Sequence, residues 1–197
     1  SFDYGAHNSA GNIFYLALQK VVSYFLPNMR VAALQFEPKF GQVKENIKAA
    51  SELIKSTKAD LFVLPELCFS GYTFVSRDEA FSLSENAANG YSIIEISELS
   101  AKLEVAIVFG FPENSNGNLY NSCVLVTPNG QNYVYRKLHL FMHEKLWFSP
   151  GDLPMQVYDF NGAKLGMMIC FDWIFPEVAR SLALSGAQIL CHPANLV

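Results

Sequence analysis

Three short apolar runs in this chain each end next to a chemically reactive side chain. The first is followed by Glu66, the second by Lys137 and the third by Cys170. A short apolar run of this kind is typical of a buried strand, and α/β folds place their sites at the carboxyl ends of such strands. We therefore expect a carboxylate, an ammonium and a thiol to meet in one pocket, as base, oxyanion stabiliser and nucleophile. The runs occupy residues 61–64, 133–135 and 166–169.

The spacing of apolar residues predicts strands alternating with helices from Met29 onward, followed by hairpins. The turn sequences Pro128-Asn129-Gly130 and Asn161-Gly162 each separate two apolar runs, which indicates hairpins. Together these patterns predict a mixed sheet with helices covering one face. The expected strands are 30–36, 60–64, 105–111, 119–127, 131–135, 157–160, 163–169 and 187–191, and the expected helices are 43–55, 93–103 and 176–185.

Composition narrows the class of protein. The 197 residues are 51% hydrophobic and 16% charged, which is typical of a folded domain with a sizeable core. The net charge is −4 and no cluster of lysine or arginine is present, so a nucleic-acid partner is not expected. None of the four cysteines forms a C-x-x-C pair, which favours a reduced, cytoplasmic protein with free thiols.

Residues 1–28 differ from the rest of the chain. The apolar stretch 13–26 is interrupted by Gln19 and Lys20 and is too short to span a bilayer comfortably, so no membrane partner is expected. Its spacing is helical and Pro27 would end the helix. We interpret residues 1–28 as a leader or N-terminal extension of uncertain origin, with a native docking helix as the alternative.

Each reactive residue also has an ordinary structural interpretation. A lone cysteine such as Cys170 is commonly buried and inert, and Glu66 could be a loop residue that faces water. Lys137 could be a surface lysine, although it follows Arg136, and two neighbouring strand residues must face opposite ways. If the three do converge, Lys137 and the turn after the strand should favour the Cys170 thiolate and make it the most reactive of the four thiols.

A metal site is the competing interpretation of the histidines. His139 and His143 are four residues apart and Glu144 follows, but the metalloprotease pattern requires glutamate directly after the first histidine, where Leu140 stands. We therefore predict no metal, and a metal-binding protein built on His139, His143, Cys191 and His192 remains only a third hypothesis. Other polar and aromatic residues are expected to act as ion-pair or capping groups (Asp172, Glu177, Arg180) or to line a pocket or pack (Trp147, Phe148).

Taken together, these motifs resemble the nitrilase superfamily of carbon–nitrogen hydrolases, from about Met29 to the end of the chain. The resemblance implies an α/β fold of the four-layer αββα sandwich type, with Glu66, Lys137 and Cys170 as the catalytic triad. It also implies substrate-side roles for Glu144, Phe171 and Asn195. The stretches that carry it are Pro65-Glu66-Leu67 with Gly71-Tyr72, residues 135–141 with Glu144 and Pro150-Gly151-Asp152, residues 169–173 with Phe175-Pro176-Glu177, and Gly186-Ala187 with His192-Pro193-Ala194-Asn195.

The same resemblance implies a function. The expected reaction is hydrolysis of a non-peptide C–N bond in a small amide, carbamoyl compound or nitrile, through a cysteine thioester and without a cofactor. A homodimer or larger assembly is expected, paired through helix 176–185 and the strand after it. Family members continue past the position of Val197 with further strands, so residues 29–197 are expected to be a C-terminally incomplete hydrolase domain. The alternatives are an inactive fragment of such an enzyme or an acyltransferase that uses the same triad.

Overall fold

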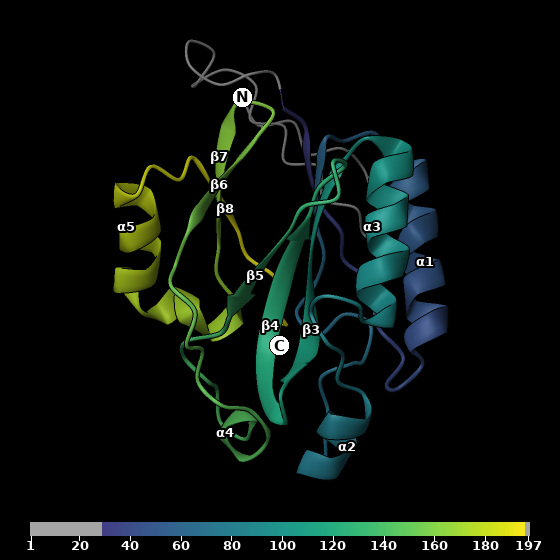
Figure 1. Ribbon diagram of the computed structural model, residues 1–197, viewed down its shortest axis with the longest axis vertical. Helices are drawn as coiled ribbons and strands as arrows, with labels where there is room; N and C mark the ends of the chain where they lie inside the picture. The colour runs from purple at the N-terminus through teal and green to yellow at the C-terminus, as the bar shows by residue number, and fades with distance from the viewer. Residues whose placement is uncertain (1–28, 196–197) are drawn as a thin grey trace, which may run out of the picture.

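The computed structural model describes residues 29–195, and these form four layers in the order helix, sheet, sheet, helix (Figure 1). Helices α1 and α3 cover the outer face of a five-stranded sheet, and helix α5 covers the outer face of a three-stranded sheet. The inner faces of the two sheets pack against each other. This arrangement confirms the αββα sandwich, whereas the expected extension over residues 1–28 lies outside the described residues.

The five-stranded sheet has the order β1-β2-β3-β4-β5, and the three-stranded sheet has the order β6-β7-β8. Strands β1, β2 and β3 are parallel, β3, β4 and β5 are antiparallel, and the β6–β7 hairpin is joined by a parallel β8. The strands are β1 (Val31–Ala33), β2 (Leu61–Val63), β3 (Ala106–Ser115), β4 (Asn118–Val126), β5 (Asn132–Arg136), β6 (Val157–Phe160), β7 (Ala163–Met167) and β8 (Ile189–Cys191). The helices are α1 (Val43–Ser56), α2 (Arg77–Ser82), α3 (Tyr91–Leu103), α4 (Glu144–Trp147), the 3₁₀ helix η1 (Cys170–Ile174) and α5 (Pro176–Leu184).

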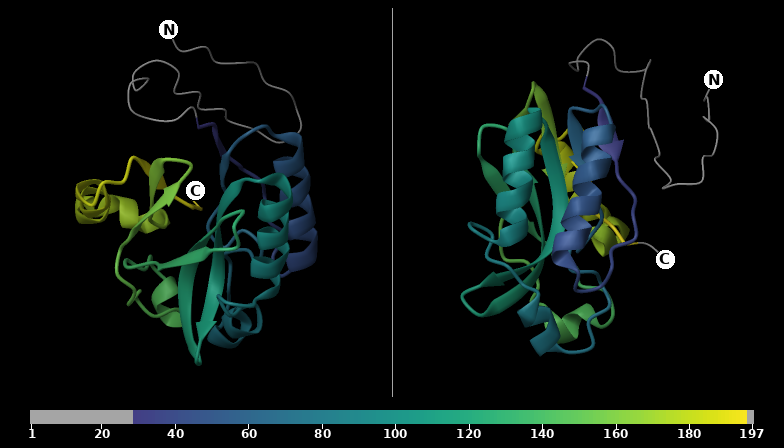
Figure 2. Two further views of the ribbon diagram at one scale, coloured as in Figure 1. Left: turned by 45° about the horizontal axis from the view of Figure 1, so that its top comes forward. Right: turned by 90° about the vertical axis from the view of Figure 1, so that its right-hand side faces the viewer.

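Successive side chains of strand β4 belong alternately to two hydrophobic cores. Val124 and Val126 face the layer of α1 and α3, while Cys123 and Leu125 face the second sheet. Successive side chains of a strand point to opposite faces, so a strand buried on both sides is apolar throughout. Figure 2 shows α1 and α3 side by side on the outer face of the sheet, the face to which Val124 and Val126 point.

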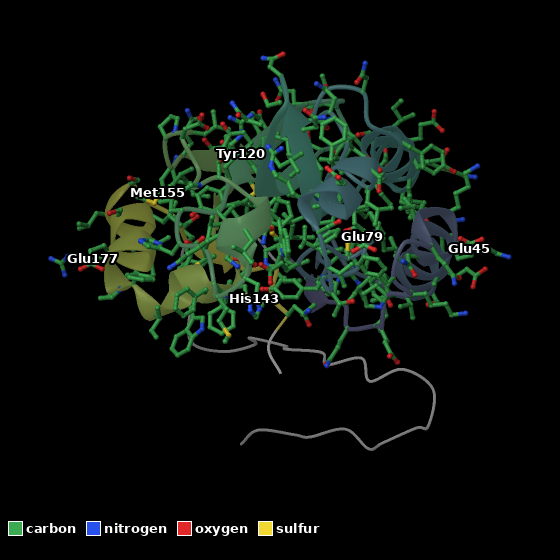
Figure 3. All side chains as sticks on the ribbon, turned by 90° about the horizontal axis from the view of Figure 1, so that it is seen from below. Glu45, Glu79, Tyr120, His143, Met155 and Glu177 are labelled. Carbon is green, nitrogen blue, oxygen red and sulfur yellow. The ribbon has the colours of Figure 1, made fainter. Side chains whose placement is uncertain are left out.

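The outer helices are amphipathic. Helix α1 buries Ile47 and Ile54 and leaves Glu45 in solvent, and α5 buries Val178 and exposes Glu177. Glu45 and Glu177 lie at opposite edges of the molecule when it is seen from the end that carries α2 and α4 (Figure 3). This is the 3.6-residue pattern of a helix that packs on one side only. Among the described residues, no helix is both long enough and apolar enough to cross a bilayer.

Several predicted elements differ from those observed. The first strand covers only Val31–Ala33 instead of residues 30–36, although Leu34 still donates one backbone hydrogen bond to Val63. Residues 114–118 do not merely form a turn, because Asn116 and Gly117, both with positive φ, close the long β3–β4 hairpin. Helices α2 and α4 and the 3₁₀ helix were not predicted, because they are too short to show a helical repeat.

Candidate active site

Glu66, Lys137 and Cys170 are delivered by the ends of three strands. Glu66 follows β2 and Lys137 directly follows β5, both in the five-stranded sheet, while Cys170 opens the 3₁₀ helix after β7 in the other sheet. Glycine makes the Glu66 position possible: a Cβ on Gly110 would lie 2.7 Å from the Glu66 Cα atom and 2.5 Å from the Leu67 nitrogen. The loop after β2 can therefore pack directly on β3.

Lys137 is completely buried between two carboxylates. Its ammonium donates to Glu66 Oε1 at 2.7 Å and to Glu144 Oε1 at 2.8 Å. Burial alone would lower the pKa of Lys137, but the two carboxylates raise it above its ordinary value, so the side chain is charged. Arg136 points to the other face of β5, where it pairs with Glu113 and Asp152. The alternation expected for two adjacent basic residues is therefore observed.

The two oxygens of Glu66 have different surroundings. Oε1 accepts hydrogen bonds from Lys137 and, at 2.8 Å, from Asn121, whereas Oε2 is buried and accepts none from the described residues. Burial raises the pKa of Glu66 to about 6. The attraction of Lys137 lowers the pKa but offsets only part of this effect, and the negative charge of Glu144 raises the pKa further. This carboxylate can take up a proton near neutral pH and has one oxygen free to do so.

Asn121 is a site residue that the sequence analysis missed. Its amide nitrogen donates to Glu66 Oε1 at 2.8 Å and to Glu144 Oε1 at 3.0 Å, and its backbone carbonyl accepts from the Lys137 nitrogen. The signal was available in β4, where Asn121 stands in alternating register with Cys123 and Leu125. A polar residue on a face that packs against another sheet needs partners, and that requirement could have identified it.

Cys170 lies at a strained turn. Its φ is 38°, and its backbone is held by a hydrogen bond from its nitrogen to the Pro193 carbonyl and by His192 Nε2, 2.9 Å from its own carbonyl oxygen. A residue with a β-carbon rarely adopts this conformation, and such strain is concentrated at functional sites. Cys170 is the least buried of the four cysteines, which are all free, with 6% of its surface exposed.

The expectation of a resting Cys170 thiolate is wrong. Burial, followed by the negative charge of Glu66, raises the pKa of the Cys170 thiol to about 12, and the opposing attraction of Lys137 is too weak to reverse this. Lys137 is already paired with two carboxylates, so its positive charge offsets only part of the effect of burial and Glu66 on the sulfur. Cys170 therefore enters any reaction as a thiol whose proton must be removed by a neighbouring base.

The three residues expected on the substrate side lie around this centre. Glu144 is buried and accepts from Tyr72 at 2.7 Å, in addition to Lys137 and Asn121. Asn195 brings its backbone carbonyl to 3.9 Å from the Cys170 sulfur, while its side chain is exposed. Phe171 is half-buried and packs against neighbouring aromatic rings.

Two cavities flank the triad, and neither is lined by the triad itself. One, of about 440 Å³, lies between the loop after Lys137 and the 3₁₀ helix and includes Phe171 and His139. The other, of about 350 Å³, includes Tyr72 and Glu144 at its polar side. Phe148 contributes to both cavities and is buried, so it both packs and lines a pocket; Trp147 lines the second cavity.

The histidines take other partners. His139 lies 2.9 Å from the Asp172 carboxylate and stacks on Phe175, and His143 is exposed on the side that carries α2 and α4 (Figure 3). Between residues 29 and 195, no group of three histidine, cysteine or acidic side chains is placed to share a metal ion. Asp172 has the capping role that its sequence position suggested, because its carboxylate accepts from the Ile169 nitrogen at the start of η1.

Comparison with known proteins identifies the family to which this chain belongs. The sequence profile of the carbon-nitrogen hydrolase family matches residues 30–196 of this chain. The chain belongs to the carbon–nitrogen hydrolase family. This family member is 44% identical, over 86% of its length, to a protein named nitrilase from Pyrococcus abyssi, and 34% identical, over 84% of its length, to an N-carbamoylputrescine amidase from Solanum tuberosum.

Solved structures agree with the sandwich of this carbon–nitrogen hydrolase. An amidase from Nesterenkonia sp. superposes with a TM-score of 0.71 at 24% identity, with 85% of this chain and 65% of that chain covered. A structure titled N-terminal amidase reaches a TM-score of 0.75 at 22% identity, covering 84% of this chain and 47% of that chain. The chain spans 66% of the Pyrococcus protein and 58% of the Solanum protein.

Proposed function

We propose that this chain carries the catalytic centre of an enzyme that hydrolyses a non-peptide C–N bond in a small amide, carbamoyl compound or nitrile through a cysteine thioester. The observation that carries the proposal is the pairing of Glu66 with Lys137 beside Cys170. One Glu66 oxygen is anchored to the ammonium and the other has no donor among the described residues. That free oxygen can take the thiol proton without breaking an existing hydrogen bond.

The proposed first half-reaction forms the thioester. The Cys170 sulfur attacks the substrate carbon while its proton passes to Glu66 Oε2. The ammonium of Lys137 has three N–H groups, of which two are used on Glu66 and Glu144, so the third can stabilise the developing negative charge on the substrate oxygen or nitrogen. For an amide or carbamoyl compound, Glu66 then returns the proton to the leaving nitrogen, and ammonia or an amine departs.

The second half-reaction releases the acid. Water attacks the thioester carbon, Glu66 takes one proton from that water, and the Cys170 thiol is re-formed as the acid leaves. A nitrile would add a water molecule before its nitrogen departs as ammonia. If another nucleophile replaced water, the same residues would carry out acyl transfer. No step requires a metal or an organic cofactor.

The substrate class rests on the relatives as well as on the site. The similar proteins include one named nitrilase and several named N-carbamoylputrescine amidase, names that refer to a nitrile and to a carbamoyl compound. We propose that Glu144, Phe171 and Asn195 face the substrate, since all three surround Cys170 or its partners. We also propose a homodimer working in a reducing, cytoplasmic environment, which the four free cysteines favour.

The test is mass spectrometry of the intact protein during incubation with a panel of amides, carbamoyl compounds and nitriles. We expect a mass gain equal to the acyl group, mapped to the peptide that contains Cys170, and release of the acid on longer incubation. The Cys170→Ala variant should show neither, while Cys191→Ala should behave like wild type. Acyl groups that accumulate on Cys68, Cys123 or Cys191 instead would contradict the proposed nucleophile.

A further inference from the structure

The carboxylate of Asp172 is fully buried two residues after Cys170, and it accepts four hydrogen bonds. Its Oδ2 accepts from the Ile169 nitrogen at 3.0 Å and from the Tyr135 hydroxyl at 2.8 Å. Its Oδ1 accepts from the His139 nitrogen at 3.0 Å and from His139 Nδ1 at 2.9 Å. This carboxylate takes no part in the bond-making and bond-breaking steps of the proposed reaction.

The positions of the donors are informative. Ile169 directly precedes Cys170, whereas Tyr135 and His139 stand two residues before and two residues after Lys137. Asp172 therefore ties the segment that carries the thiol to the segment that carries the ammonium. These segments belong to different sheets, so the link crosses the interface between the two halves of the sandwich.

The turn at Cys170 needs such a constraint. Its φ of 38° is unfavourable for a residue with a β-carbon and persists only where the surroundings fix it. Pro193 and His192 hold the Cys170 backbone from the side of β8, and Asp172 holds the preceding peptide from the side of β5. Without the second anchor, the turn could relax and carry the sulfur away from Glu66 and Lys137.

We propose that Asp172 is a positioning residue, which holds the Cys170 thiol in register with Glu66 and Lys137 by bridging the two strand ends. The inference rests on the proposed function, because it assigns Asp172 to the geometry of that reaction. It goes beyond an ordinary buried hydrogen bond with His139, which would contribute to stability alone.

The reactivity of the Cys170 thiol toward iodoacetamide can distinguish a positioning role of Asp172 from a purely stabilising one, and the measurement needs no substrate. A thiol that exchanges its proton with Glu66 reacts at a rate that rises through the pKa of Glu66, about 6, and then stays level until the pair begins to lose its second proton at higher pH, because one proton is shared within the pair. An isolated thiol instead gains about tenfold in rate per pH unit until its own pKa is reached. The ionisable groups that face Cys170 or Asp172 are Glu66, Tyr72, Cys123, Tyr135, Lys137, His139 and His192.

The decisive variant is Asp172→Asn. An asparagine has one acceptor oxygen, so its NH₂ group must face either the Ile169 nitrogen or the His139 nitrogen, and one anchor is lost in either orientation. We expect the level region above pH 6 to disappear and the alkylation rate of Cys170 at pH 7 to fall by at least about tenfold, the scale of a displaced reacting group. Peptide mapping reports Cys170 separately from the other thiols.

The matched control is Ile54→Ala, which opens a cavity under α1 in the core on the far face of the five-stranded sheet. It should lower the unfolding temperature and leave the pH profile of Cys170 unchanged. An Asp172→Asn protein that is destabilised but keeps the wild-type profile and rate would overturn the proposal. If Asp172→Asn does not fold, Tyr135→Phe decides, since it removes one of the four hydrogen bonds without a change of charge; an unchanged profile there would also overturn it.

The proposed function can fail separately. If acyl groups never form on Cys170 but the level region is present in wild type and lost in Asp172→Asn, the hydrolase assignment fails and the positioning role stands.

Discussion

At the scale of single residues, Glu66 is the group whose environment is most unusual. One of its oxygens is bound to Lys137 and Asn121, the other is buried without a donor among the described residues, and its pKa is raised to about 6 by burial. A buried carboxylate oxygen that accepts no hydrogen bond lowers stability. The position is unfavourable for the fold and favourable for proton transfer, so removing the charge should separate the two effects.

We predict that Glu66→Gln is inactive but not less stable at alkaline pH. Because the folded-state pKa of Glu66 lies above the unfolded value of about 4.5, its contribution favours folding at low pH and is lost as pH rises through about 6. Denaturant unfolding at pH 5 and at pH 8 should show that Glu66→Gln loses less stability across this interval than wild type does. Acylation of Cys170 should fall at least about a hundredfold, the scale for loss of a general base. Near-normal acylation would remove Glu66 from the mechanism.

Lys137→Met tests the other half of the pair. The variant keeps the length of the stem and removes the ammonium, leaving Glu66 and Glu144 without their shared cation. We expect acylation to fall at least about a hundredfold, and the double variant with Glu66→Gln to be little worse than either single one, because the triad acts as a unit. Single-turnover kinetics with an activated amide measures this. Effects that multiply would argue against a joint role.

Asn121→Asp should disturb the site without a change of shape, because it replaces a hydrogen-bond donor by a negative charge in a side chain of the same outline. A third carboxylate would face Glu66 and Glu144, so the pKa of Glu66 should rise further and the acidic limb of Cys170 alkylation should move to higher pH. Stability at pH 8 should fall by about 1–3 kcal/mol, the cost of lost buried hydrogen bonds. The control is Asn46→Asp, a buried asparagine of α1 bonded to Lys39 and Phe69, which should leave the limb in place.

The positions of the reactive residues could be predicted from the sequence, but the burial and charges around them could not. Apolar runs indicated the positions of Glu66, Lys137 and Cys170, and alternation predicted the opposite facing of Arg136 and Lys137. The raised pKa of Cys170 could not be foreseen, because it depends first on burial and then on the charge of Glu66, which Lys137, shared with a glutamate seven residues further along, offsets only in part. Such a sum of burial and charges requires the coordinates.

At the scale of elements, two glycines set how closely loops approach strands around the site. Gly110 of β3 lets the Glu66 loop pack on the strand, and a Cβ on Gly151 would collide with the Arg136 carbonyl oxygen beside Lys137. The long elements were predictable because they carry several turns of periodic burial, as in α1. The elements that hold the nucleophile were not, because η1 has only five residues and its geometry comes from contacts distant in sequence.

Gly110→Ala should therefore damage the site and the fold together. Its new methyl group would overlap the backbone at Leu67 and Glu66, so we expect a loss of about 1–3 kcal/mol in unfolding free energy and a displaced Glu66. The level region in the pH profile of Cys170 alkylation should be lost. Gly90→Ala is the matched control, since its methyl group would collide with Glu85 near the start of α3. Equal effects of both variants on the profile would contradict the local explanation.

At the scale of the whole molecule, three large apolar side chains are exposed beside the three-stranded sheet, as others are around α2, α3 and α4. Trp173 and Ile174 at the end of η1 and Leu184 at the end of α5 are 55%, 49% and 76% exposed. Large apolar residues exposed along one region are typical of an interface. Leu184 lies in helix 176–185, which the sequence resemblance associated with dimer packing, and Trp173 and Ile174 lie just before that helix. Their exposure supports the proposed homodimer.

We predict that the protein sediments as a dimer or larger assembly at micromolar concentration. Ile174→Glu and Leu184→Glu should shift it toward monomer, because a charge buried in an interface is unfavourable. Phe81→Glu, at a 48% exposed position of α2, should sediment like wild type. A wild-type monomer at micromolar concentration, or dissociation by the α2 variant as well, would count against the assignment of this surface.

The placement of the thiol on one sheet and of its base and cation on the other has a consequence for folding in the cell. Glu66 and Lys137 leave the ribosome before Cys170 does, and during that interval the chain has no assembled reaction centre. In the proposed reaction the thiol meets its base only when the second sheet docks on the first, so docking of the sheets and assembly of the reaction centre are one event. The rate at which iodoacetamide labels Cys170 at a fixed pH would then report whether the two sheets are docked.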